Sequence, residues 1–531
     1  MCVPSASVVR FAFLSLLSLS AAVALPGVVL AEDTATPAAS GDAQAGQQVD
    51  GNAVLKQGQE ALKAGDFDKA LGIFDHLAAV IEHNQQSPDT LKALELVYTL
   101  RAEAFSGQRE FEASEAEFKK VLDQDSTYLP ALMGRGQMRI EAGATDLAMQ
   151  DFQSVLEQDR ANVDALFGLG KCYTLLGGFQ QAVKPLTTVI TKDDKNAEAY
   201  RHRAVAYAGL TKYKQAHADM DKSLQLDPEQ YESYFALGTI YLKEEKYEDA
   251  AKAFGEAIKR YKPKGDSDDP YAQGYLTKAA ALVEAGKLEK DEAKKKALNK
   301  EAIADCDKLI EQLGDVPTYA TAKAATEYRR GVAFRMMGQL GDAVNAFSEA
   351  IKLNPDLGEA YFRRGICFFQ LSENDLALAD FQKASTLTYD DPRSRLWEGF
   401  TEAKLNDFHE AIRAYGQAIS ESDRYTPAYV NRGLAYMMIG EYDKALADFD
   451  EAIRLEPTES GHYFKRGVIY EKKGKQQEAA DSFTSAIKFD DKNVLAYRHA
   501  AKALTALGHN DLASEYNRKA DSLAPKQESN D

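Results

Sequence analysis

The chain has 531 residues, of which 45% are hydrophobic and 27% are charged, and its formal net charge is -18. This composition is typical of folded protein and excludes an intrinsically disordered chain. The negative charge disfavours a nucleic-acid partner, because the phosphate backbone would be repelled.

Residues 1–31 are predicted to form a secretory signal peptide. Arg10 is the only charged residue before an apolar run from Phe11 to Ala24, and Val29-Leu30-Ala31 supplies small residues for cleavage. An uncleaved N-terminal membrane anchor is the alternative, since Phe11 to Ala31 is long enough to cross a bilayer. We therefore expect an exported protein, periplasmic or extracellular. Residues 32–50, rich in Ala, Thr, Gly and Gln, are predicted to be a flexible linker.

From residue 51 the sequence repeats with a period of 34 residues, and the clearest copy runs from Thr426 to Glu459. Counted within one copy, the recurring residues are Tyr at position 4, Arg-Gly at 7–8, Tyr at 11, Gly at 15, Tyr at 17, Ala at 20, Phe at 24, Ala at 27 and Pro at 32. This pattern resembles the tetratricopeptide repeat (TPR) family, in which each unit is a helix–turn–helix. The resemblance implies an all-α, right-handed superhelical solenoid of about thirteen units.

Repeats 1–6 are assigned to residues 51–262. Their small residues at position 8 are Gly58, Ala102, Gly136, Gly170, Ala204 and Gly238. The first spacing is 44 residues instead of 34, so about ten residues near Asn84 to Asp89 are predicted to lengthen a connection. The small residue at position 8 is expected to let the two helices of a repeat pack closely around the Phe at position 24.

Residues 263–323 are predicted to hold a linker and a degenerate seventh repeat. The polar stretch Lys262 to Pro270 carries two prolines and is not expected to be helical. Ala279 and Cys306 match positions 8 and 24 only if eleven residues, around Leu288 to Leu298, are inserted between the helices. The insertion is charged and favours helix, so repeat 7 is predicted to have lengthened helices. It is expected to be a solvated extension, or alternatively a hinge or a spur that contacts a partner.

Repeats 8–13 are assigned to residues 324–525, with position 8 occupied by Gly331, Gly365, Gly399, Gly433, Gly467 and Ala501. In the last repeat Asn517 replaces the expected Phe, which predicts a helix that faces solvent and caps the array. Residues 526–531 form a polar tail.

No motif in the sequence predicts catalysis or a cofactor. We find no Gly-rich phosphate loop, nucleophile elbow or metal-binding spacing of Cys or His. Cys172, Cys306 and Cys367 fall at helix positions of the repeat and are predicted to be core residues. We therefore predict a non-enzyme with no catalytic residues, no cofactor and no metal; an enzyme with an unrecognised site is the weakest alternative.

A candidate binding groove follows from the resemblance, which implies that the first helix of each repeat lines a concave surface through positions 2, 5, 9, 12 and 13. In repeats 9–12 many of these positions, together with Trp397 at position 6, hold apolar residues: Phe362, Ile366, Phe369, Leu396, Trp397, Phe400, Val430, Leu434, Met437, Met438, Phe464 and Val468. Such a stripe would suit a peptide. Alternatively, these side chains pack against adjacent helices, and Trp397 fills structure instead of anchoring a ligand.

Two other patterns bear on the partner. The carboxylate clamp of chaperone-binding family members is absent, because only Asn431 matches its residues. The recurrent Tyr-x-x-Arg pattern, as in Tyr361/Arg364, is expected to serve packing because it recurs with the period.

The predicted function is a non-catalytic scaffold, in the cell envelope or secreted, that binds a peptide or protein partner. A membrane partner is expected only if the N-terminal segment stays uncleaved. The alternative is an accessory subunit of an envelope enzyme or of a polymer-export or assembly complex.

Overall fold

The structure is a computed structural model, which describes residues 28–29, 48–83, 88–263, 271–388 and 391–523. Most of the predicted signal peptide, most of the predicted linker and the polar tail lie outside these residues. At the N-terminal end, strand β1 (Val28–Val29) pairs antiparallel with β2 (Gln48–Val49). The pair joins the end of the predicted signal peptide to the end of the predicted linker.

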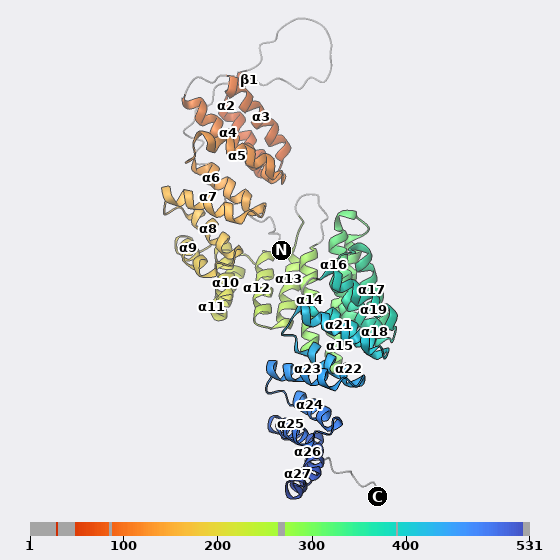
Figure 1. Cartoon of the computed structure of the whole chain (residues 1–531). Coiled ribbons are helices and arrows are strands. Elements are labelled where there is room, and N and C mark those ends of the chain that lie inside the picture. The colour runs from red at the N-terminus through yellow and green to blue at the C-terminus, as the bar shows by residue number, and fades with distance from the viewer. Residues whose placement is uncertain (1–27, 30–47, 84–87, 264–270, 389–390, 524–531) are drawn as a thin grey trace. The chain divides into compact units, whose positions relative to one another are not determined.

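The described residues form 26 α-helices, which pair in chain order into thirteen helix hairpins (Figure 1). The chain divides into two compact units, unit 1 up to Lys262 and unit 2 from Pro263. The predicted all-α repeat solenoid is thus confirmed.

Unit 1 contains α2 (Gly51–Ala64), α3 (Phe67–His83), α4 (Pro88–Gly107), α5 (Phe111–Gln124), α6 (Leu129–Glu141), α7 (Thr145–Gln158), α8 (Val163–Leu175), α9 (Phe179–Lys192), α10 (Ala197–Gly209), α11 (Tyr213–Leu226), α12 (Tyr231–Lys243) and α13 (Tyr247–Arg260). Unit 2 contains α14 (Ala272–Leu288), α15 (Glu292–Leu313), the 3₁₀ helix η1 (Pro317–Tyr319), α16 (Ala320–Met336), α17 (Leu340–Leu353), α18 (Gly358–Gln370), α19 (Asn374–Leu387), α20 (Pro392–Lys404), α21 (Phe408–Glu421), α22 (Thr426–Met438), α23 (Tyr442–Leu455), α24 (Ser460–Lys472), α25 (Gln476–Phe489), α26 (Val494–Ala506) and α27 (Asn510–Leu523).

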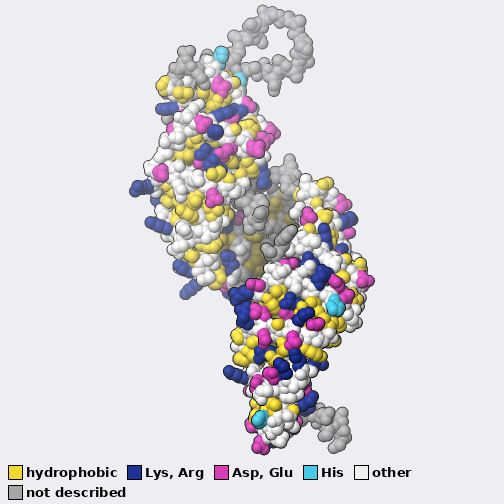
Figure 2. Space-filling model, in the orientation of Figure 1, with side chains coloured by type: hydrophobic (Ala, Val, Ile, Leu, Met, Phe, Trp, Pro, Cys, Tyr) yellow, Lys and Arg dark blue, Asp and Glu magenta, His cyan; other side chains and the backbone are white. Residues whose placement is uncertain are grey.

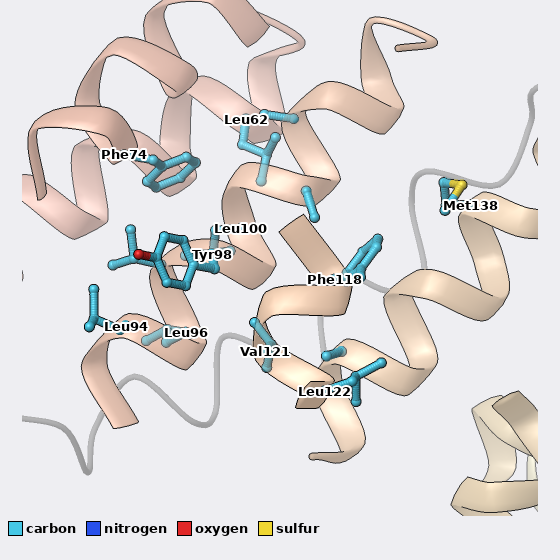
Figure 3. Close-up of a cluster of buried hydrophobic side chains, with 14 of the residues drawn as sticks. Leu62, Phe74, Leu94, Leu96, Tyr98, Leu100, Phe118, Val121, Leu122 and Met138 are labelled. Atoms are coloured by element: carbon cyan, nitrogen blue, oxygen red, sulfur yellow. The ribbon is translucent and has the colours of Figure 1, made fainter. Parts of the chain in front are cut away.

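Each helix pair closes where position 8 meets position 24. A Cβ added to Gly467 on α24 would lie 2.6 Å from Cε1 of Phe483 on α25, so only glycine leaves room for the ring. Figure 3 shows the equivalent core of unit 1, in which Phe74 and Phe118 are fully buried among leucines of neighbouring helices. The predicted pairing of small and large residues is confirmed.

The turn between the two helices of a repeat depends on position 15, where the backbone is left-handed. Gly440 has φ 81° there, as expected for a residue without a Cβ. Five repeats place another residue at position 15 and still adopt φ between 58° and 66°: Arg109, Thr211, Glu245, Ser372 and Asn406. The turn geometry is therefore imposed by the pairing of the helices and not by glycine alone.

One sequence expectation about extra residues needs correction. The ten additional residues of the first spacing do not lengthen the connection, because α3 has 17 residues and α4 has 20, where α5 has 14 and α6 has 13. In repeat 7 the extra residues lengthen both helices, as predicted: α14 has 17 residues and α15 has 22. Only residues 289–291 separate these two helices. Gly286, aligned to position 15, therefore lies inside α14 instead of in a turn.

The ends of the core agree with the sequence. The last helix, α27, buries only Ala513 and Ala520, as expected of a cap.

Cys172, Cys306 and Cys367 are buried and unpaired, which confirms them as core residues. Burial raises the pKa of Cys172 and Cys306 to about 12, so neither thiol is a reactive nucleophile at neutral pH.

Candidate functional site

The Tyr-x-x-Arg pattern is a packing device. In repeat 9, Arg364 donates from Nε and Nη2 to both oxygens of Asp380, each over 2.8 Å, and from Nη1 to Ser348 Oγ of the preceding repeat over 2.9 Å. Its guanidinium also lies 5.5 Å from the Tyr361 ring centroid. The same bidentate pair joins Arg432 to Asp448. The expectation that this pattern serves packing is confirmed.

The twelve candidate groove residues lie on α18, α20, α22 and α24, the first helices of repeats 9–12. Phe362, Ile366 and Leu396 are buried at 5%, 7% and 6% exposure. Met438 is 61% exposed, and the other eight are half-buried. Most of the stripe therefore contributes to packing between repeats while keeping part of its surface in solvent.

Trp397 stands in the middle of a line of aromatic rings. Its ring centroid is 5.4 Å from Phe369, 5.9 Å from Phe381 and 5.6 Å from Phe400. The contacts with Phe369 and Phe400 are edge-to-face, the favoured geometry for aromatic pairs. Trp397 thus bridges α18, α19 and α20 and fills space between repeats, while its half-buried ring keeps access to solvent.

The apolar stripe continues on α22 and α24, where its side chains pack against neighbouring helices. Val430, Leu434 and Met437 pack against a cluster built from Ala445, Leu446, Phe449 and Ile469. Phe464 lies 5.7 Å from Phe483 and 5.6 Å from His499, both measured between ring centroids. Val468 packs against the C-terminal cluster. Each of these side chains therefore joins its own repeat to a neighbouring helix.

Contacts between successive first helices show that these positions share one side of unit 2. Arg393 on α20 pairs with Glu359 on α18 over 3.0 Å, and Lys404 donates to the Phe369 carbonyl over 3.0 Å. Farther along, Glu471 on α24 pairs with Lys502 on α26 over 2.6 Å. We call this side, made of positions 2, 5, 6, 9, 12 and 13 of the first helices, the first-helix face.

In unit 1 the first-helix face holds buried charges that the sequence analysis did not single out. Lys171 and Arg201 are each 6% exposed, and burial lowers the pKa of Lys171 to about 8. Arg201 makes only long ion pairs, 3.8 Å to Glu198 and 3.9 Å to Glu232. Charged residues at positions 5 and 9, where repeats 9–12 are apolar, were the available signal.

Glu103, at position 9 of repeat 2, is a buried titratable group on the same face. Both of its carboxylate oxygens are buried without a hydrogen-bond partner, and burial raises its pKa to about 8. A Cβ on Gly134, at position 6 of the next repeat, would stand 2.8 Å from the Phe118 ring and 3.7 Å from one of these oxygens, so this glycine leaves room for the ring while the carboxyl lies at ordinary contact distance.

Neither a membrane span nor a metal site occurs among the residues that the structure describes. In those ranges no helix is long and apolar enough to span a membrane. Nor do three or more His, Cys, Asp or Glu side chains gather there in a group that could hold a metal ion. On the side shown in Figure 2, hydrophobic side chains are scattered among charged ones in both units.

Stacked helix hairpins whose first helices carry a continuous face define a helical-repeat scaffold. Family models described as tetratricopeptide repeat match residues 99–163, 139–206, 203–268, 235–294, 328–392, 426–459 and 463–493. The chain therefore belongs to the tetratricopeptide repeat family, as its 34-residue period predicts. Proteins of this family are generally non-catalytic scaffolds that bind protein or peptide partners.

Individual relatives are distant. The chain is 25% identical over 131 residues to tetratricopeptide repeat protein 13 of Homo sapiens, covering 25% of this chain and 15% of that protein. It is 24% identical over 181 residues to Hsp70-Hsp90 organizing protein 3 of Arabidopsis thaliana, covering 32% of each. The chain thus spans a third or less of these relatives. The match to one solved structure, the APC/C hetero-tetramer Cut9-Hcn1, covers 90% of this chain and 94% of the matched chain. The sequence identity is 13% and the TM-score is 0.36.

Proposed function

We propose that this protein is an exported scaffold that binds an extended or helical peptide segment of a partner protein on the first-helix face of unit 2. The observation that carries the proposal is the continuous apolar stripe on α18, α20, α22 and α24, most of which stays half-buried. Side chains that are already held by packing lose little conformational freedom when a ligand covers them. Met437 and Met438 add adaptable surface at one edge.

The binding site can be tested by selecting peptides from a displayed library on the full chain. The affinity of each selected peptide is then measured for the native chain and for a double variant. The double variant combines Leu434→Ser with Met438→Ser, which change the first-helix face of α22. The matched control is Leu376→Ser, a leucine 50% exposed on the second helix α19. We expect at least a tenfold loss of affinity for the double variant and none for the control, with helical circular dichroism unchanged. Equal loss in both, or none, would contradict the proposed face.

Export is proposed from the sequence of residues 1–31. Expression of the full-length chain in a bacterial host, followed by fractionation and N-terminal sequencing, tests it. We expect the mature protein outside the cytoplasm, beginning at Glu32. Recovery of a full-length chain from the membrane would identify an anchored form, and an intact chain in the cytoplasm would contradict export.

A further inference from the structure

The helices of unit 2 are sorted by charge. Each of the six first helices from α16 to α26 has a net charge between +1 and +3, counting Lys and Arg against Asp and Glu. Each of the six second helices from α17 to α27 has a net charge of -1 or -2. In unit 1 the signs are mixed: α4 is negative among the first helices, and α9 is positive among the second. Unit 2 therefore collects its positive charge on one helix of every repeat.

The first helices still carry an excess of positive charge when the arginines of the internal Arg–Asp pairs are not counted. Those pairs use position 7, which does not belong to the first-helix face. The face positions of repeats 8–13 hold nine cations, Arg329, Arg335, Arg363, Arg393, Lys404, Lys465, Lys472, Arg498 and Lys502, against two acids, Glu359 and Glu471. This face is thus strongly basic in a chain whose formal net charge is -18.

Several of these cations border the aromatic line around Trp397. The Arg393 guanidinium lies 4.9 Å from the Phe362 ring centroid and pairs with Asp391 over 2.6 Å and with Glu359 over 3.0 Å, so a ligand carboxylate would share or replace these partners. Lys404 Nζ lies 4.3 Å from the Phe369 ring centroid. Arg335 brings a third charge from α16, and its Nε is buried without a hydrogen-bond partner. Burial and the nearby Arg363 guanidinium lower the pKa of Arg335, so the two cations repel each other. A ligand acceptor placed beside them would relieve both the repulsion and the missing hydrogen bond.

We propose that the first-helix face of α16, α18 and α20 binds an acidic peptide segment that also carries apolar side chains. This inference rests on the proposed function and specifies the chemistry of its partner. Carboxylates of the peptide would pair with Arg335, Arg393 and Lys404, since an arginine guanidinium binds a carboxylate through two parallel hydrogen bonds. Apolar side chains of the peptide would cover Phe369 and Trp397. The net charge of the whole chain would repel an acidic segment everywhere else, which confines it to this face.

Trp397 is the only tryptophan of the chain and lies at the centre of this face, so its fluorescence reports occupancy directly. Three synthetic peptides of equal length share the same apolar residues and carry Glu, Ser or Lys at all other positions. We expect the Glu peptide to change the Trp397 emission and to bind at least tenfold more tightly than the Lys peptide at low salt. The difference should shrink as salt is added, because ions screen exposed charge pairs.

A charge variant with a matched control separates this face from general electrostatics. Arg393→Gln with Lys404→Gln removes two exposed cations from the face. Lys352→Gln with Arg454→Gln removes two exposed cations, 75% and 65% exposed against 44% for Arg393, from the second helices α17 and α23, where each pairs with a glutamate three residues earlier. We expect the first variant to bind the Glu peptide at least fivefold more weakly and the control to bind it normally. Arg335→Gln, tested separately, should lower affinity in the same direction.

The outcomes are distinct. If all three peptides bind with equal affinity and compete with one another, the face binds peptides but does not select acidic ones, and this inference fails alone. If none binds or changes the Trp397 emission, and the library selection also fails, the proposed function fails with it. If single-stranded oligothymidine binds as tightly as the Glu peptide and displaces it, the face recognises polyanions in general and the assignment to a peptide is wrong.

Discussion

At the scale of single residues, side chains that pack the repeats together recur every 34 residues. Side chains that occur in one repeat alone do not follow this period. Arg364 and Arg432 repeat the same bidentate bond to an aspartate sixteen residues later. Glycine at position 8 likewise repeats because an aromatic ring fills the space that a Cβ would occupy. Glu103 and Trp397 break the period, and each lies on the first-helix face. Departures from the repeat are thus the informative residues.

The packing at position 8 predicts a large difference between two glycine substitutions. Gly467→Ala should destabilise unit 2 by about 1–3 kcal/mol, because the new Cβ would lie 2.6 Å from the Phe483 ring. Gly341→Ala on α17 should be neutral or stabilising by up to about 1 kcal/mol, because nothing lies within 4 Å of its added Cβ. Urea unfolding followed by circular dichroism compares the two. Similar midpoints for both variants would contradict the close packing.

Glu103 predicts a pH-dependent stability. Its pKa is about 8 in the folded protein, above the ordinary value of 4.5 that applies when the chain is unfolded. Below 4.5 both states are protonated, so the carboxyl costs nothing; as pH rises toward 8 the unfolded chain loses its proton first, and folding weakens. Glu103→Gln should therefore match the native protein at pH 4 and exceed it at pH 9, by on the order of 3 kcal/mol.

Thermal unfolding at the two pH values measures this difference, with Glu60→Gln on the exposed side of α2 as the control. A constant difference at both pH values would show that folding does not raise the pKa of Glu103.

At the scale of elements, extra sequence is absorbed by lengthening helices and not by enlarging loops. The additional residues continue α3 and α4 in repeats 1 and 2, and α14 and α15 in repeat 7. At the tip of the repeat 7 hairpin Asp291 caps α15 by accepting from Lys294 N over 2.7 Å, and Leu288 is 67% exposed. The charged insertion is therefore a helical extension, and whether it contacts a partner stays a prediction.

Helix caps predict the local stability of the last repeat. Asn493 Oδ1 accepts from Ala496 N over 3.0 Å at the start of α26. Asn493→Ala should weaken this repeat by about 1 kcal/mol, because a backbone donor loses its partner. Amide hydrogen exchange should then quicken in α26 and α27 and stay unchanged in α18. Lys492→Ala, an exposed neighbour, is the control, and equal exchange in both variants would contradict a role for the cap.

At the scale of the whole molecule, each of the two units contains complete helix pairs. Since a repeat needs only its neighbours to bury its apolar face, each unit should fold alone. Fragments 51–262 and 271–523 should both be helical, and their circular dichroism spectra should sum to that of the full chain after correction for residues outside them. A fragment that is unfolded by itself would show that the units depend on each other for stability.

The sequence by itself determined the fold, the number of repeats, the core residues and the capping helix. It could do so because a 34-residue period fixes which residues of neighbouring helices meet, as at Gly467 and Phe483. The tertiary structure decided where extra residues lie and how far each face residue is buried. Phe362 and Met438 both occupy face positions, yet one is 5% and the other 61% exposed, because exposure depends on which rings from adjacent repeats cover each position. The buried carboxyl of Glu103 and the aromatic line through Trp397 are likewise contacts between different repeats, and a pattern read within one repeat cannot contain them.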